Sequence, residues 1–186
     1  MNAPYEIDYE TIFRFAPVGM CISVNRVIQS SNDALTSMFG YPHGALDGES
    51  FQRLYPTVDE FLRTGHRIIP IMNARGRYSD ERIMRRANGE LFWCHVNGRA
   101  LDAGKPLGAG VWTFEDLSEK RPVTAELTPR EREIAALLVE GKTSKVIARA
   151  TDLSPRTVEM HRAKLMKKFA ASTSSELVHK LVGVAR

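Results

Sequence analysis

The pattern of hydrophobic and polar positions divides the 186-residue chain into a mixed first part, up to about residue 122, and a helical last part. In the first part, the run CISVNRVIQS predicts two short strands on either side of Asn25 and Arg26. The segment NDALTSMFGY predicts a short helix, which Asn32 caps and Gly40 ends.

Three further patterns complete the first part. The segment DERIMRRANGELFWCHVNGRAL predicts a β-hairpin that turns at Asn88-Gly89, a dipeptide typical of tight turns in which both residues have positive φ. The segment VDEFLRTGHRIIPIMN predicts a helix in its first half, and residues 110–114 predict another strand. At least five short strands with few helices indicate an α+β domain with a single antiparallel sheet, covered on one face by helices.

Start signals in the last part predict four helices and an all-α domain. LTPREREIAALLVEG opens with a capping box of Thr128 and Glu131, with Pro129 at the first helical position. SPRTVEMHRAKLMKKF repeats the signal with Ser154 and Pro155. The segments TSKVIARA and SSELVHKLVGVA supply the other two helices.

Two of these helices are joined by the short connection TDL, an arrangement typical of a helix-turn-helix. In the first, Val146 and Ile147 are expected to be buried. On a helical wheel of the second, Val158, Leu165 and Phe169 fall within one narrow arc and are expected to face the core.

The opposite face of that second helix carries candidate DNA contacts. Glu159 can accept from cytosine N4, Met160 can touch a thymine methyl, and the short Ala163 lets the backbone approach base edges. Phosphate contacts are expected from Lys145, Arg156, Thr157, Lys164 and Lys167. The alternative is an ordinary solvated amphipathic helix, since basic helix faces are common.

The distribution of charge favours the nucleic-acid interpretation. Residues 1–122 hold 14 Lys and Arg against 15 Asp and Glu, whereas residues 123–186 hold 12 against 7, so the net charge of +4 arises in the last third. Such a split indicates a polyanion-binding module joined to another domain. The chain has no apolar run long enough to span a membrane and no apolar signal region, and it is therefore expected to be cytoplasmic.

The whole last third, LTPREREIAALLVEGKTSKVIARATDLSPRTVEMHRAKLMKKFAASTSSELV, resembles the DNA-binding domain of LuxR-type regulators without a gap. The resemblance implies that the helix with residues 157–168 enters the major groove and contacts bases through Glu159, Met160 and Ala163. Thr151 stands where the family usually has an apolar residue, and it is expected to loosen the packing of the short helix.

The segments FRFAPVGMCISV, SNDALTSMFGY, DERIMRRANGELFWCHVNGRAL and GVWTFEDLSEKR together resemble a PAS sensor domain. The resemblance implies a five-stranded sheet with helices on one face, a small ligand between them, and dimerisation through the segment before the first strand, here YEIDYETIFRFAP. We therefore divide the chain into a PAS domain at 1–119, a linker at 120–126 and a LuxR-type helix-turn-helix domain at 127–186.

The PAS resemblance suggests two candidate cofactors, flavin and haem. Cys21 and Cys94 both lack the asparagine-cysteine-arginine context of flavin photosensors, so flavin chemistry is not expected. His66 lies one position from the axial histidine of haem PAS proteins, where this chain has Arg67; a surface histidine is favoured over a haem ligand. The sequence shows no metal-ligand spacing, phosphate-binding loop or catalytic set, so the cofactor stays unknown and no enzyme is expected.

These patterns predict a one-component, sequence-specific transcription regulator. It is expected to bind double-stranded promoter DNA as a homodimer, to work with RNA polymerase, and to sense a small molecule or a partner through its PAS domain. One alternative is a ligand-free PAS domain that only docks a partner protein. Another, a phosphoacceptor receiver domain, disagrees with the predicted hairpin. A further hypothesis is that the two domains dock and mask the recognition helix when no signal is present.

Overall fold

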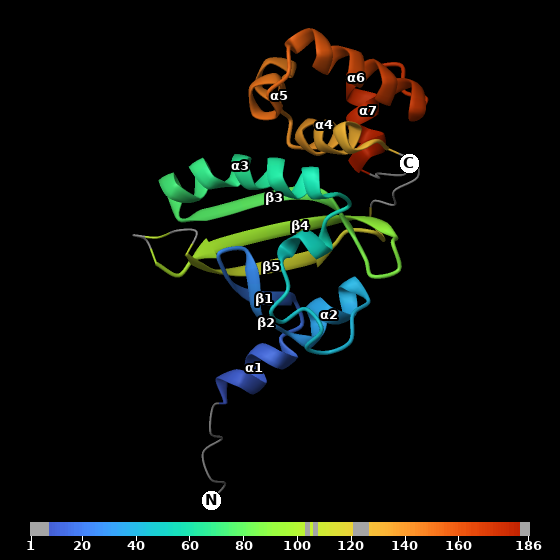
Figure 1. Cartoon of the computed structure of the whole chain (residues 1–186). Coiled ribbons are helices and arrows are strands. Elements are labelled where there is room, and N and C mark those ends of the chain that lie inside the picture. The colour runs from blue at the N-terminus through green and yellow to red at the C-terminus, as the bar shows by residue number, and fades with distance from the viewer. Residues whose placement is uncertain (1–7, 103–104, 106–107, 121–126, 183–186) are drawn as a thin grey trace, which may run out of the picture.

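The first domain is built on one antiparallel sheet. The computed structural model describes residues 8–102, 105, 108–120 and 127–182. Its elements up to residue 120 are α1 (Tyr9–Phe15), β1 (Gly19–Val24), β2 (Val27–Ser31), α2 (Asp33–Phe39), the 3-10 helix η1 (Phe51–Leu54), α3 (Val58–Arg75), β3 (Arg77–Arg85), β4 (Leu91–Ala100) and β5 (Ala109–Asp116). The five strands run in the order β2-β1-β5-β4-β3 (Figure 1). The predicted α+β fold with a five-stranded antiparallel sheet is confirmed.

Two hairpin turns differ from each other in a way that the sequence did not indicate. The turn from β1 to β2 is a two-residue turn in which Asn25 and Arg26 have φ of 49° and 66°. The turn from β3 to β4 spans residues 86–90, and only Gly89 has positive φ there. The predicted hairpin is present and turns at these residues, but the expected two-residue turn with positive φ at both Asn88 and Gly89 is wrong. The longer loop instead has the Asn88 side chain accepting from the backbone amide of Glu90 at 3.0 Å.

Helix α3 is longer than predicted, because it continues through Pro70 to Arg75. Phe61, Ile68 and Met72 are buried along one side of it, at the spacing of successive helical turns. A proline inside a helix removes one backbone hydrogen bond. Packing of this apolar side against the sheet outweighs that loss, so the helix does not end at the proline.

The two faces of the sheet bury different partners. On one face, Phe39 of α2 meets the rings of Phe92 and Phe114 edge to face, at centroid distances of 5.2 and 5.9 Å. On the other face, Ile83 and Trp93 are paired across β3 and β4 and pack against the last part of the chain. Both faces near the β3 edge are thus occupied.

The last part of the chain consists of four helices, as predicted. They are α4 (Pro129–Val139), α5 (Ser144–Thr151), α6 (Pro155–Lys168) and α7 (Ser174–Val182). The capping box of Thr128 and Glu131 is present, and Ser154 caps α6. Ile147 is fully buried, but Val146 is 44% exposed, so its predicted burial is wrong. Only one side of the short α5 reaches the small core.

The helical domain rests on the first domain through α4, which lies beside α3 and β3 (Figure 1). A single apolar cluster joins Ile83, Trp93 and Leu117 of the first domain to α4 and its neighbours. Most of the expected linker, residues 121–126, lies outside the described residues. Within the described part of the chain, no helix combines the length and apolar character needed to cross a bilayer.

Candidate nucleic-acid interface and sensor cavity

The turn between α5 and α6 sets the direction of α6. Asp152 ends α5 in the left-handed conformation with φ of 53°. Ser154 then accepts from the backbone amide of Thr157 at 3.0 Å, and Pro155 occupies the first helical position. Short-range signals therefore start α6 at Pro155, three residues after Asp152.

Packing and hydrogen bonds then hold α6 in place. Val158 and Leu165 are completely buried against the small core, and Phe169 packs on its edge, as the helical wheel predicted. Arg162 donates to the hydroxyls of Ser144 in α5 at 2.6 Å and Ser174 in α7 at 2.7 Å. Arg162, which the sequence analysis did not single out, thus joins three helices.

The face of α6 that points away from this core is open to solvent. Glu159, Met160 and Ala163 are exposed, and Met160 keeps 51% of its surface accessible. The flanking residues of the predicted set are exposed at Lys145, Arg156, Lys164 and Lys167 and half-buried at Thr157. The structure thus brings the candidate base-reading residues together on one face with cations around them.

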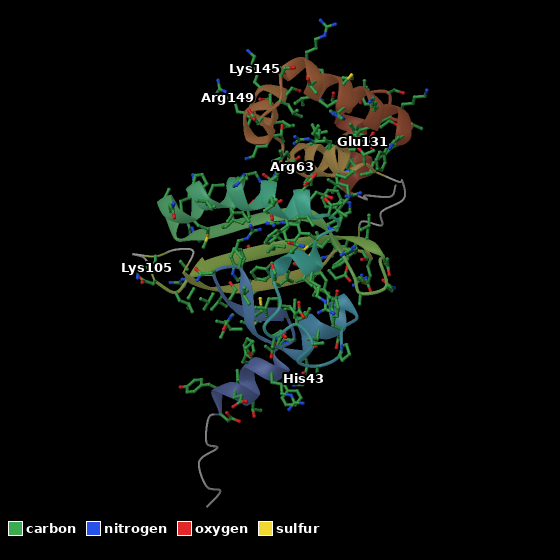
Figure 2. The ribbon with its side chains drawn as sticks, in the orientation of Figure 1. His43, Arg63, Lys105, Glu131, Lys145 and Arg149 are labelled. Atoms are coloured by element: carbon green, nitrogen blue, oxygen red, sulfur yellow. The ribbon has the colours of Figure 1, made fainter. Side chains whose placement is uncertain are left out.

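Helix α5 adds a cation that the sequence analysis missed. Figure 2 shows Lys145 and Arg149 projecting from α5, away from the first domain. Both are exposed. The four-residue spacing, which places both on one side of a helix, was the available signal.

Two residues with uncertain roles in the sequence have defined environments. Thr151 is 4% exposed, and its hydroxyl donates to the carbonyl of Ile147 at 2.8 Å, so its polar group is satisfied inside the core. The expected loosening of α5 finds no support in this packing. His161 is half-buried, and its Nδ1 has no hydrogen-bond partner among the described residues.

The first domain contains a small cavity between the sheet and α3. Its interior volume is about 40 Å³, room for roughly three water molecules. The lining residues are Arg26, Phe51, Tyr55, Gly65, Ile68, Ile69, Arg82, Met84, Val96, Trp112 and Phe114. Trp112 lies over Gly98, where an added Cβ would come within 2.3 Å of the indole ring, so the glycine makes room for this wall.

Two arginines bring positive charge to this largely apolar cavity. Arg82 donates to Tyr55 and, through Nε at 2.8 Å, to Asp80, which also accepts from Arg67 at 2.9 Å. Arg26 lies over the ring of Phe61. Neither arginine was singled out from the sequence, because the folded chain alone places them at the cavity.

The cofactor candidates lie apart from the cavity lining. His66 is exposed on α3 and is absent from that lining, which agrees with a surface histidine. Arg67, at the position where haem PAS proteins carry their histidine, binds Asp80 instead. Cys21 and Cys94 are buried free thiols, and burial raises the pKa of both.

Charged contacts hold the two domains together. Arg132 of α4 donates to both carboxylate oxygens of Glu60 in α3, at 2.6 and 3.0 Å, and both side chains are at least 91% buried. Arg63 donates to Glu133 at 3.0 Å, at the place where α3 faces α4 (Figure 2). This docking uses α4 and leaves the outer face of α6 exposed. In this arrangement docking does not cover the recognition helix, and masking in the absence of signal stays a hypothesis.

Two family models match successive parts of the chain. The family model described as bacterial regulatory proteins of the luxR family matches residues 125–181, and a PAS domain model matches residues 17–119. The chain is 29% identical over 154 residues to the sensor protein TdiS of Thauera aromatica, covering 83% of this chain and 25% of that protein. It is 50% identical over 79 residues to the transcriptional regulatory protein FixJ of Bradyrhizobium diazoefficiens, covering 42% of this chain and 37% of FixJ. The chain thus spans well under half the length of these relatives.

Two solved structures are similar to different extents of the chain. The PAS domain of a LuxR-family transcriptional regulator from Burkholderia thailandensis, in complex with ethanol, is 59% identical; the match covers 60% of this chain and 99% of that one, with a TM-score of 0.58. The VqmA protein of Vibrio cholerae is 21% identical and matches 96% of this chain and 89% of its own, with a TM-score of 0.57. The second likeness concerns the fold alone.

Proposed function

Since this chain belongs to the PAS-domain proteins and carries a DNA-binding domain of the luxR family of bacterial regulatory proteins, we propose that it regulates transcription by binding promoter DNA sequence-specifically. The observation that carries the proposal is the exposed outer face of α6, with Glu159, Met160 and Ala163 between basic flanks. A helix of this kind fits the major groove, where base edges can be read. The family is one of regulators rather than enzymes, and we assign no catalytic residue.

We further propose that the regulator acts as a homodimer in the cytoplasm, together with RNA polymerase. One short recognition helix reads only a few base pairs, and a twofold site doubles the contact. Helix α1 supports the proposal, because Tyr9, Ile12 and Phe15 are 54% to 78% exposed in the single chain. The structures of VqmA include a dimer without its target DNA and a complex with ligand and DNA.

The PAS domain is proposed to control DNA binding within the same chain, in response to a small molecule. The cavity supports a ligand, and the Burkholderia relative holds ethanol. The buried contact between Glu60 and Arg132 supplies a physical connection from α3 to the DNA-binding domain. The alternative is a PAS domain without ligand that docks a partner protein. A native mass spectrum of the purified chain separates the two: extra mass on the dimer favours a ligand, and bare polypeptide favours docking.

Gel shifts with the full chain test the DNA interface. Lys164→Ala and Lys167→Ala are each expected to weaken binding to all DNA and to reduce the slope of affinity against salt by about one unit, because each removes one phosphate contact. Glu159→Ala and Ala163→Lys are expected to change which sequence is preferred. A sequence preference that survives both of these changes contradicts the base-reading assignment.

A further inference from the structure

Arg26 occupies a backbone position that arginine rarely adopts. In the two-residue turn between β1 and β2 both residues have positive φ, and Arg26 is the second, at 66°. Glycine is the favoured residue at the second position of such turns, because a side chain there is strained. Residues held in strained conformations cluster at functional sites, which makes Arg26 a candidate functional residue.

Helix α3 has a glycine, Gly65, at the point where the side chain of Arg26 contacts it. An added Cβ on Gly65 would lie 2.3 Å from Nη1 of Arg26. Glycine in the middle of a helix is unfavourable relative to alanine. Two locally unfavourable residues, far apart in the sequence, thus combine to place one guanidinium at the cavity wall.

The charge of this guanidinium is not neutralised by the described residues. Arg26 donates from Nη2 to the carbonyl of Phe61 at 2.8 Å and stacks over its ring, 3.5 Å from the centroid. None of the ion pairs within the described part of the chain includes Arg26, whereas Arg82 is paired with Asp80. Burial lowers the pKa of Arg26, and the interaction with Tyr55 opposes this shift only in part.

The rest of the cavity lining offers no negative charge. The lining residues comprise two arginines, Tyr55 and otherwise apolar or glycine positions. A half-buried cation with no counter-ion favours an anionic ligand, since a charge-assisted hydrogen bond to a carboxylate is short and strong. The volume of about 40 Å³ limits that ligand to a few non-hydrogen atoms.

We propose that the cavity binds a short-chain monocarboxylate, with its carboxylate on the guanidinium of Arg26 and its carbon chain against the apolar wall that includes Ile68 and Trp112. This assignment rests on the proposed function, because it names the class of signal that the PAS domain receives. The competing explanation is purely structural: Arg26 clamps the β1–β2 turn to α3 through Phe61. The two explanations differ in whether an acid and its neutral amide bind differently.

Fluorescence of the full-length chain separates these explanations. The chain has two tryptophans, so Trp93→Phe leaves Trp112 in the cavity wall as the single reporter. We expect propionate to change Trp112 emission saturably, with a Kd about tenfold or more below that of propionamide, which has the same shape without the charge. Acetate with acetamide and butyrate with butyramide extend the comparison by one carbon each way.

Two variants and one control locate the effect. Arg26→Gln removes the charge, and Gly65→Ala keeps the charge but displaces the guanidinium while favouring the helix. Both are expected to raise the Kd for propionate about tenfold or more and to leave propionamide unchanged. Arg53→Gln removes an exposed cation outside the lining and is expected to change neither.

The outcomes also separate this inference from the proposed function. Equal binding of acid and amide, unchanged propionate binding in both Arg26→Gln and Gly65→Ala, or no saturable response to any of the three acids overturns the carboxylate assignment. A gel shift on the same protein reports DNA binding independently. If the chain binds DNA but none of the acids, only the proposed ligand class is refuted. If the unmodified chain does not bind DNA, the proposed function is refuted.

Discussion

Replacement of Glu60 by glutamine is expected to destabilise the chain strongly, because it breaks the buried ion pair between the two domains. Arg132 loses the carboxylate that it contacts at 2.6 and 3.0 Å, and the exposed fractions of the two side chains are only 9% and 8%. Removing one partner of a buried pair leaves an uncompensated charge, which costs about 3–5 kcal/mol. Glutamine still offers one acceptor oxygen, so we expect the lower end, ~3 kcal/mol, or a change on the order of 10²-fold in the unfolding equilibrium.

Urea unfolding, followed by tryptophan fluorescence and far-UV circular dichroism, measures this change. The Glu49→Gln variant is the matched control, because its pair with Arg53 is exposed on both sides and is expected to contribute less than about 1 kcal/mol. The double variant Glu60→Gln with Arg132→Gln is expected to recover much of the loss, since neither side chain is then charged. A Glu60→Gln chain as stable as the Glu49→Gln control would refute the argument that this pair holds the domains together.

Three further predictions concern single residues. Burial raises the pKa of Glu131, but hydrogen bonds from Lys168 and a backbone amide outweigh it and hold the pKa below its ordinary value of 4.5. The resulting stabilisation is present above that value and lost as pH falls, so Glu131→Gln should flatten the decline in urea midpoint between about pH 5 and pH 3. Gly98→Ala places a Cβ against the ring of Trp112 and should lower the free energy of unfolding by about 1–3 kcal/mol in the same assay. Arg162→Ala removes two hydrogen bonds to serine hydroxyls of α5 and α7; it should lower the thermal midpoint and weaken DNA binding in gel shifts, and an unchanged midpoint would contradict its role in supporting α6.

Local signals predicted most of the fold. The caps at Asn32, Thr128 and Ser154 lie where the sequence placed them, because each acts within three or four residues of itself. The buried side of α6 followed from helical periodicity alone. The candidate DNA-binding face can therefore be predicted from the sequence, while its base contacts stay predictions.

Features that depend on distant residues were missed. The continuation of α3 past Pro70 depends on packing against the sheet, which no local pattern encodes. The pairing of Glu60 with Arg132 joins residues that are 72 positions apart. Arg26 and Gly65 each look unremarkable in the sequence, and only the folded chain brings the guanidinium to the space above the glycine.

Tyr55 and Arg82 line the cavity in the first domain and also line the space where Glu60, Arg132 and Glu133 meet between the domains. A compound in the cavity and the docked DNA-binding domain would therefore both lie next to the side chains of Tyr55 and Arg82. Thermodynamic linkage makes the coupling between ligand binding and domain docking reciprocal. If a bound compound strengthens docking by some factor, docking strengthens the affinity for that compound by the same factor. If promoter DNA also favours one domain arrangement, occupied promoters and free protein would respond to the compound at different concentrations.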